Sequence, residues 1–241
     1  MHRFYVTGQQ LLEGSVRFNP AQARQMLRVL RMGVGSRVLV FNGSGREWEV
    51  HIVTASPREV TGRIVAEVST PRESPLRIVL LQAMLKGDRM DYVVQKVTEM
   101  GVAEIVLLST TRTVTQGPGK VTRWSKIALE AAEQSGRLTI PSLTGPYRLE
   151  QIAAEPIPAP AIALWEGEQV GTLARLLDHQ VSPPTAIRVL VGPEGGLEPD
   201  EVALLKRAGF VSVSLGPRIL RAETAAVAAL AVLQHRWGDL C

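Results

Sequence analysis

The sequence of 241 residues contains a single cysteine, Cys241, at its last position. A lone cysteine cannot form an internal disulfide, and no histidine or second cysteine lies beside it at metal-ligand spacing, so we expect no metal site. The chain also lacks any apolar run near the roughly 20 residues that span a bilayer. No apolar segment of signal-peptide length follows the first basic residues. These absences favour a cytoplasmic protein with no membrane partner.

Lysine is scarce, because only five of the 27 basic residues are lysines and arginine supplies the other 22. The formal net charge is +4, which is compatible with a polyanionic partner but does not require one. A guanidinium group pairs with phosphate through two hydrogen bonds and stacks on bases. The arginines therefore fit a nucleic-acid partner, although a GC-rich genome would also favour arginine codons.

The first 70 residues have the pattern of a small β module. Three short runs rich in β-branched residues, 37–42, 48–54 and 60–68, predict strands. Asn42-Gly43-Ser44-Gly45, between the first two runs, predicts a hairpin turn. Three short strands joined by tight turns indicate a small β-barrel.

A helix is predicted ahead of these strands, over residues 20–31, with Pro20 in its first turn. Arg24, Arg28 and Arg31 follow one another at spacings of four and three, which places their guanidinium groups on one helix face. This face is either a nucleic-acid contact or a merely solvated surface. The helix by itself does not decide between the two.

Residues 71–75 end a polar run with two prolines and predict a linker between two domains, 1–70 and 76–241. Beyond the linker, strands are predicted over 76–82, 104–108, 161–165, 187–191 and 211–215, with helices over 88–100, 123–135, 171–177, 199–208 and 222–237. Strands alternating with helices specify an open, mostly parallel sheet with helices on both faces. We therefore expect an α/β fold for the second domain.

The segment from Ile187 to Gly196 is an apolar strand that runs directly into a glycine-rich turn. Ligands of open α/β sheets bind beyond the carboxyl ends of the strands, where glycines let the backbone approach a ligand. The turn lacks the G-x-G-x-x-G spacing of a dinucleotide site and the G-x-x-x-x-G-K of a phosphate loop, which disfavours NAD binding and ATP hydrolysis. It indicates a nucleotide pocket, although a purely structural turn could use the same glycines.

A second strand end, at Ser214, leads through Gly216 into a helix that is mostly alanine. A helix that is apolar on nearly every face is buried, so we expect residues 222–237 to lie in a tightly packed core or at a subunit interface. Arg221 and Glu223 stand at its entrance, where polar groups are costly to bury without a partner or a task. They form either a structural ion pair or part of a catalytic site.

Six segments, spread in order along the whole chain, together form a distinctive set: His2-Arg3-Phe4-Tyr5-Val6, Val29-Leu30-Arg31, residues 95–102, residues 130–137, Gly192-Pro193-Glu194-Gly195-Gly196 and residues 215–225. With these segments the sequence resembles the SPOUT class of RNA methyltransferases and, within it, the RsmE family, which methylates N3 of a uridine in small-subunit ribosomal RNA. The resemblance implies an N-terminal PUA-like barrel that helps bind RNA, a C-terminal sheet whose last segments thread a trefoil knot, and a homodimer packed across the knotted regions.

The resemblance also implies that S-adenosylmethionine lies in a cleft formed by three loops and the start of the last helix. The residues expected to contact the cofactor are Leu164, Trp165, Gly192, Pro193, Glu194, Gly195, Gly196, Leu215, Gly216, Ile219, Leu220, Thr224 and Ala225. Uracil N3 carries a proton at neutral pH, so a base must remove it before the nitrogen can attack a methyl group. Glu223 or Glu194 could take that proton, and Arg221 could stabilise the charge on the uracil oxygens. We favour Glu223 with Arg221.

Arg3, Arg24, Arg28 and Arg31 are expected to contact RNA, and the implied substrate is 16S ribosomal RNA within the assembled small subunit. Two other functions stay open. One is a SPOUT-class methyltransferase acting on transfer RNA or on a ribose 2′-hydroxyl, although such enzymes usually lack this N-terminal module. The other is a non-catalytic RNA-binding protein of ribosome assembly, which degraded cofactor loops would favour, whereas these loops are intact in the sequence.

Overall fold

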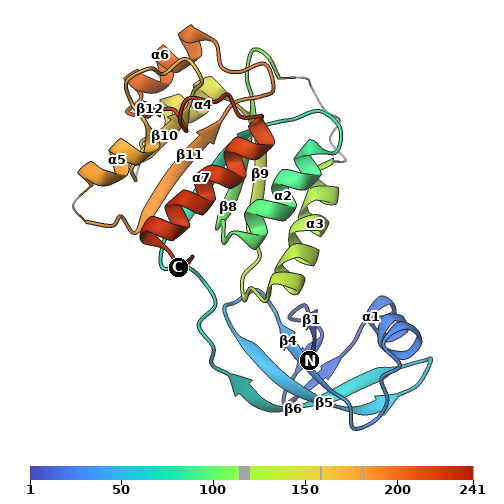
Figure 1. The fold of residues 1–241 in the computed structure, drawn as a ribbon. Coiled ribbons are helices and arrows are strands. Elements are labelled where there is room, and N and C mark those ends of the chain that lie inside the picture. Colours follow the sequence, from blue (N-terminus) through green and yellow to red (C-terminus); the bar gives the residue numbers. More distant parts are fainter. Residues whose placement is uncertain (114–119, 158, 181, 241) are drawn as a thin grey trace. The chain divides into compact units, whose positions relative to one another are not determined.

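The computed structural model describes residues 1–113, 120–157, 159–180 and 182–240. They form two compact units, which we call unit 1 (residues 1–73 and 132–140) and unit 2 (residues 74–131 and 141–241) (Figure 1). Within these described ranges, no helix is both long enough and apolar enough to cross a membrane.

Unit 1 is built on a mixed six-stranded sheet in the order β1-β4-β5-β6-β3-β2 (Figure 1). Its strands are β1 His2–Tyr5, β2 Leu11–Leu12, β3 Ser15–Arg17, β4 Arg37–Phe41, β5 Glu47–Ala55 and β6 Val60–Val68. The three longest strands confirm the prediction. The sequence pattern misses β1, β2 and β3, because runs of two to four residues are too short to establish a period. β1 pairs with β4 in parallel and the other neighbours pair antiparallel, so the sheet is mixed.

The helix expected over residues 20–31 is shorter and changes type along its length. α1 spans Pro20–Arg24, and a π-helical turn, η1, spans Gln25–Val29. Arg31 lies beyond this turn with φ at 52°, a backbone conformation that is uncommon for residues other than glycine. The expectation that three arginines share one helix face is therefore wrong for Arg31.

Residues 132–140 pack with unit 1, so the last residues of α3 (Lys120–Ser135) belong to it. Glu73 ties this segment down by accepting hydrogen bonds from Leu138 N at 2.7 Å, Thr139 N at 3.0 Å and Arg137 Nη2 at 2.8 Å. Burial alone would raise the pKa of Glu73, but Arg137 and the Thr139 amide outweigh it, and the pKa lies below its ordinary value. The predicted division into residues 1–70 and 76–241, with a linker at 71–75, does not assign this segment to the first domain.

Unit 2 contains a six-stranded sheet in which every pair of neighbours is parallel, in the order β12-β10-β11-β7-β8-β9. Its strands are β7 Arg77–Ala83, β8 Glu104–Ser109, β9 Ser142–Arg148, β10 Ala161–Leu164, β11 Ala186–Val191 and β12 Val211–Val213. This sheet confirms the expected α/β fold, and it adds β9, which the sequence pattern misses. The trefoil knot stays a prediction.

Helices cover both faces of this sheet (Figure 1). They are α2 Arg89–Glu99, α3, α4 Leu149–Ala154, α5 Leu173–His179, α6 Pro199–Arg207 and α7 Ala222–Trp237. α2 packs against α7, which contacts β7 and β11. Val79 and Leu81, alternate residues of β7, instead join a core with Ile152 of α4 and Leu205 of α6. Because alternate side chains of a strand point to opposite faces, α4 and α6 cover the face opposite α7.

The strand order places the loops after β10, β11 and β12 at one edge of the sheet. The chain adds β8 and β9 on one side of β7, and then returns to build β10, β11 and β12 on the other side. Such a reversal leaves a crevice beyond the carboxyl ends of the strands. Leu164, Val191 and Val213 are the last residues of their strands, so the loops that follow them meet at this crevice.

Candidate active site

A pocket of about 390 Å³ occupies this edge of unit 2, within the size range of small-molecule sites. The loops after β10, β11 and β12 form it together with the first turn of α7. The predicted residues that line it are Leu164, Trp165, Gly192, Pro193, Glu194, Gly196, Leu215, Gly216, Ile219, Leu220, Arg221, Glu223 and Ala225. Gly195 and Thr224 are neighbours of lining residues and are not themselves in the lining. The structure thus brings the three predicted loops together, and contact with a cofactor remains a prediction.

The glycine-rich turn after β11 needs glycine for two different reasons. Gly196 has φ at +74°, a backbone conformation that is strained for residues with a side chain. At Gly192 a Cβ would lie 3.0 Å from Leu197 Cγ, closer than ordinary van der Waals contact. Arg112 braces the turn from outside, because it donates to Gly195 O and pairs with Glu198 at 2.7 Å. The turn therefore presents backbone without side chains to the pocket at Gly192 and Gly196.

Glu194, one of the two candidate bases, is fixed by two donors. Its Oε1 accepts hydrogen bonds from Lys86 N at 2.7 Å and from Arg89 Nη1 at 3.0 Å. Burial alone would raise the pKa of Glu194, but these hydrogen bonds outweigh it, and the pKa lies below its ordinary value. A carboxylate with a lowered pKa is a weak proton acceptor, so the environment of Glu194 disfavours it as the base.

Glu223, the other candidate base, has one oxygen without a partner. Its Oε1 lies 3.8 Å from Arg89 Nε, whereas its Oε2 is buried and accepts no hydrogen bond from any described residue. The side chain is 14% exposed and belongs to the first turn of α7, where the helix dipole favours negative charge. Glu223 therefore has one carboxylate oxygen beside Arg89 and a second oxygen that no described residue engages.

Arg221 does not pair with Glu223, although the two are close in sequence. Arg221 is exposed at the N-cap of α7, lines the pocket, and forms no ion pair with the described residues. Arg89, and not Arg221, lies beside Glu223. The interpretation of Arg221 and Glu223 as a structural ion pair is therefore wrong, and the Arg221 guanidinium is available to a ligand.

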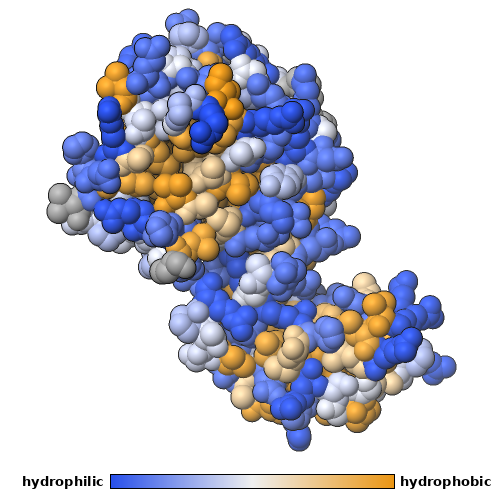
Figure 2. All heavy atoms as spheres, viewed as in Figure 1, coloured by the Kyte–Doolittle hydropathy of each residue, from blue (hydrophilic) through white to orange (hydrophobic). Residues whose placement is uncertain are grey.

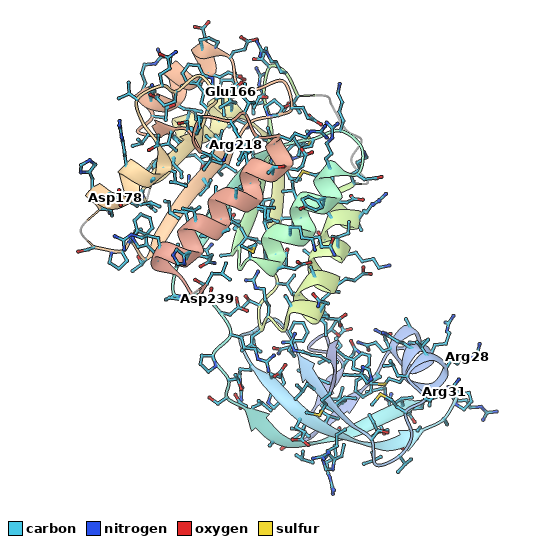
Figure 3. All side chains as sticks on the ribbon, in the orientation of Figure 1. Arg28, Arg31, Glu166, Asp178, Arg218 and Asp239 are labelled. Carbon is cyan, nitrogen blue, oxygen red and sulfur yellow. The ribbon has the colours of Figure 1, made fainter. Side chains whose placement is uncertain are left out.

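Sequence reasoning missed several lining residues, of which Arg89 contacts both candidate bases. Arg89 begins α2, the helix that follows β7, and the sequence alone does not reveal that β7 lies next to β11. A signal was present, since Lys86 and Arg89 follow the end of an apolar strand. Glu166 and Arg218 also line the pocket, from two different loops near the start of α7 (Figure 3).

The loop after β10 is organised by Glu168, whose side chain is 14% exposed. Its Oε1 accepts hydrogen bonds from Gly171 N and Val170 N, both at 3.3 Å, and its Oε2 pairs with Lys206 Nζ at 3.2 Å. The Gly171 amide, followed by Lys206, lowers the pKa of Glu168 to about 2. Because Trp165 and Glu166 belong to the same loop, Glu168 supports one wall of the pocket.

We expect Glu168→Gln to destabilise the protein at pH 6 and to lose this effect as the pH falls. A carboxyl whose pKa is lowered by folding contributes stability above its unfolded value, here 4.5, and loses it as the pH falls toward about 2. Urea unfolding of both proteins at pH 6, 4.5 and 3 measures this. A stability difference that stays constant over this range would contradict the assigned role of Glu168.

The guanidinium group of Arg3 makes its contacts within unit 1. Its guanidinium stacks on Phe41 at 3.8 Å from the ring centre, pairs with Glu47 and donates to Ala132 O at 3.1 Å. The side chain is only 8% exposed. These contacts anchor β1 and disfavour an RNA contact of Arg3, which stays a prediction. Arg28 and Arg31 are exposed and project outward beside α1 (Figure 3).

Comparisons with known proteins agree with this geometry. A family model described as an RNA methyltransferase domain matches residues 72–234, and one described as an RNA methyltransferase PUA domain matches residues 19–65. The ribosomal RNA small subunit methyltransferase E of Synechocystis is 33% identical over 95% of this chain and 76% of that protein. The chain belongs to this methyltransferase E family.

Two solved structures are similar to this family member over nearly their whole length. The methyltransferase E of Neisseria gonorrhoeae, crystallised with S-adenosyl methionine bound, is 32% identical with a TM-score of 0.90 and covers 100% of both chains. A Legionella pneumophila protein, solved with the cofactor SAM bound, is 37% identical with a TM-score of 0.87, over 99% of this chain and 98% of that one. Among the residues that the structure describes, no group of three or more histidine, cysteine, aspartate or glutamate side chains could hold a metal ion.

Proposed function

We propose that this chain transfers a methyl group from S-adenosylmethionine to N3 of a uridine in 16S ribosomal RNA. The observation that carries the proposal is that the glycine-rich turn, the loop after β12 and Glu223 line one pocket. Membership of the methyltransferase E family supports the substrate, and the cofactor-bound relatives support the methyl donor. A 16S substrate would make the enzyme cytoplasmic.

The pocket fits the proposed cofactor in size and chemistry. Leu164, Trp165 and Leu220 offer apolar surface, and the glycine-rich turn offers backbone groups without side chains in the way. Small-molecule sites combine apolar walls with a few polar groups in this manner. When bound, S-adenosylmethionine supplies an electrophilic methyl group on its sulfonium sulfur. The three loops would hold it and exclude water from the methyl group.

Two side chains at the start of α7 have separate roles, one in proton transfer and the other in stabilising charge. Glu223 takes the proton of uridine N3, so that the nitrogen lone pair can form the new bond to the methyl carbon while the electron pair of the broken carbon–sulfur bond stays on sulfur. Arg221 stabilises the negative charge that develops on the uracil oxygens. Arg89 holds Glu223 in place through the contact at 3.8 Å and engages Glu194 at 3.0 Å.

Methyl transfer from labelled cofactor to separate RNA pools tests the proposal against its alternatives. In the presence of a chelator, the purified chain should label 16S ribosomal RNA or the small subunit taken from a strain lacking the enzyme. It should leave 23S ribosomal RNA and transfer RNA unlabelled. Label in transfer RNA or on a ribose 2′-hydroxyl would favour another SPOUT-class activity, and binding of 16S ribosomal RNA without transfer would favour an assembly protein.

Unit 1 is the proposed RNA-binding module. Arg24, Arg28 and Arg31 are exposed, and none of them forms an ion pair with another residue in the described ranges. Arginines without a protein partner are free to pair with phosphates, and such contacts strengthen binding at low salt. We propose that these three residues position the RNA, without specifying its sequence.

We also propose that the enzyme is a homodimer that buries one face of α7. Figure 2 shows an apolar patch over this helix, and Val232, a residue of α7, is 40% exposed. Light scattering should report about twice the chain mass of 26.2 kDa. Val232→Asp should shift the protein toward monomer, whereas the matched change Val34→Asp, at a position 70% exposed in unit 1, should not. A monomeric wild type that still methylates RNA would contradict the proposal.

A further inference from the structure

Unit 1 contains a hollow of about 710 Å³ beside α1 and η1. Three separate segments line it: the end of β3, the α1–η1 helix, and the turn between β5 and β6. Its charged residues are Arg17, Arg24, Arg28, Arg58 and Glu59. Its apolar residues are Phe18, Pro20, Ala23, Leu27 and Pro57. The hollow therefore combines cationic side chains with apolar walls.

Most of the positive charge of the hollow has no acidic partner among the described residues. Arg17 pairs with Glu59 at 3.0 Å, and both side chains are exposed. Arg24, Arg28 and Arg58 are exposed and have no ion-pair partner in the part of the chain that the structure describes. Positive groups that converge from separate segments repel one another, and an anion placed among them relieves that repulsion. The hollow therefore favours a negatively charged ligand.

Phosphate contacts alone do not explain the apolar walls. Phe18 is 5% exposed and closes the hollow from the core side, its ring 5.9 Å from that of Phe4. Leu27 is half-buried and Pro57 is exposed. Apolar surface of this kind suits the flat face of a nucleobase, and arginine planes stack on bases as well. A base inside a double helix is not available to such a surface, whereas an unpaired base is.

The α1–η1 segment, which lines the hollow, departs from regular α-helical structure. η1 is a single π-helical turn, a feature found frequently at functional sites. Arg31, just beyond it, has a positive φ, and backbone strain of this type also clusters at ligand sites. Arg24 and Arg28 line the hollow and Arg31 does not, so the irregular turn separates the three arginines into two groups.

We infer that this hollow holds one unstacked nucleotide of the RNA substrate. Its phosphate lies against Arg24, Arg28 and Arg58, and its base lies against Leu27 and Pro57. The inference rests on the proposed function, because it takes RNA as the substrate, and it adds a base-binding site to the phosphate contacts. Arg31, outside the hollow, contacts phosphate only.

Fluorescence anisotropy with the full-length protein tests the inference on two short single-stranded RNAs. The two have equal length and charge, and the second lacks its central bases. Because stacking of one base contributes substantially to affinity, we expect the complete RNA to bind at least about fivefold more tightly at the same salt concentration. Leu27→Asn should remove most of this preference. Arg58→Ala should weaken binding of both RNAs and reduce the slope of log affinity against log salt by about one.

Arg37→Ala is the matched control, because Arg37 is an exposed arginine of unit 1 that pairs with Glu49 at 3.4 Å and does not line the hollow. It should bind both RNAs as the wild type does. Equal affinity of the wild type for the two RNAs, or Arg58→Ala indistinguishable from wild type, would overturn the inference. Methyl transfer to 16S ribosomal RNA without base preference would leave the proposed function standing. Base preference without methyl transfer would contradict the proposed function alone.

Discussion

Replacing Glu223 with glutamine should slow methyl transfer to 16S ribosomal RNA by roughly a hundredfold or more, the usual scale for a lost general base. An amide has nearly the shape of a carboxylate but cannot take the proton of uridine N3. Since Glu223 Oε2 accepts no hydrogen bond from the described residues, the substitution removes no protein contact there. Single-turnover kinetics measure the rate, and calorimetry and anisotropy should show that cofactor and RNA still bind.

The pH dependence separates proton transfer from structure. Raising the pH should partly rescue Glu223→Gln, because hydroxide can remove the uracil proton in place of the carboxylate. Glu194→Gln, the matched change at the carboxylate that Lys86 N and Arg89 hold, should lack this rescue. If Glu223→Gln instead abolished cofactor binding or unfolded the protein, Glu223 would be a structural group, and Glu194 would become the candidate base.

Replacing Arg221 with alanine should lower kcat by roughly a hundred- to a thousandfold, the range observed when one donor to a developing oxyanion is removed. Its guanidinium is exposed, lines the pocket and has no ion-pair partner within the described residues, so its charge is available to the uracil oxygens. For the same reason the melting temperature should stay close to that of the wild type. Steady-state kinetics with 16S ribosomal RNA and thermal unfolding measure the two effects.

Arg207→Ala provides the control for Arg221→Ala, because Arg207 is an exposed arginine of α6 that does not line the pocket. It should leave both kcat and KM unchanged. Arg221→Lys should recover part of the lost rate, since it keeps the charge but not the planar fork. An Arg221→Ala variant with a raised KM for RNA and an unchanged kcat would assign Arg221 to phosphate binding.

Much of the fold can be predicted from periodicity, because the parallel sheet of unit 2 is buried on both faces. β7 and β11 are nearly continuous apolar runs. α2 buries one stripe of its side chains, and the helix is followed by Gly101, whose φ is +81°. The strands of two to four residues at the start of the chain carry no comparable period. The π-helical turn Gln25–Val29 is also not visible in the sequence, and it invalidates the helical spacing assumed for Arg31.

The pocket could be predicted from the sequence only where strand ends carry glycine-rich turns. The loops after β11 and β12 could be identified from Gly192, Gly196 and Gly216, since glycines at strand ends mark close approach. Arg89 could not, because its place beside Glu223 depends on strand order. Contacts between distant segments decide which charges stay free, and local spacing does not encode them.

Mass spectrometry of 16S ribosomal RNA nucleosides detects the product of the proposed methyl transfer itself. RNA from a strain lacking the enzyme is analysed before and after incubation of its small subunits with the purified protein and S-adenosylmethionine. We expect N3-methyluridine to be absent before incubation, to appear after it, and not to appear with Glu223→Gln over the same time. A new methyl group on a ribose or on another base, or no new methyl group with the wild-type protein, would contradict the proposed methyl transfer.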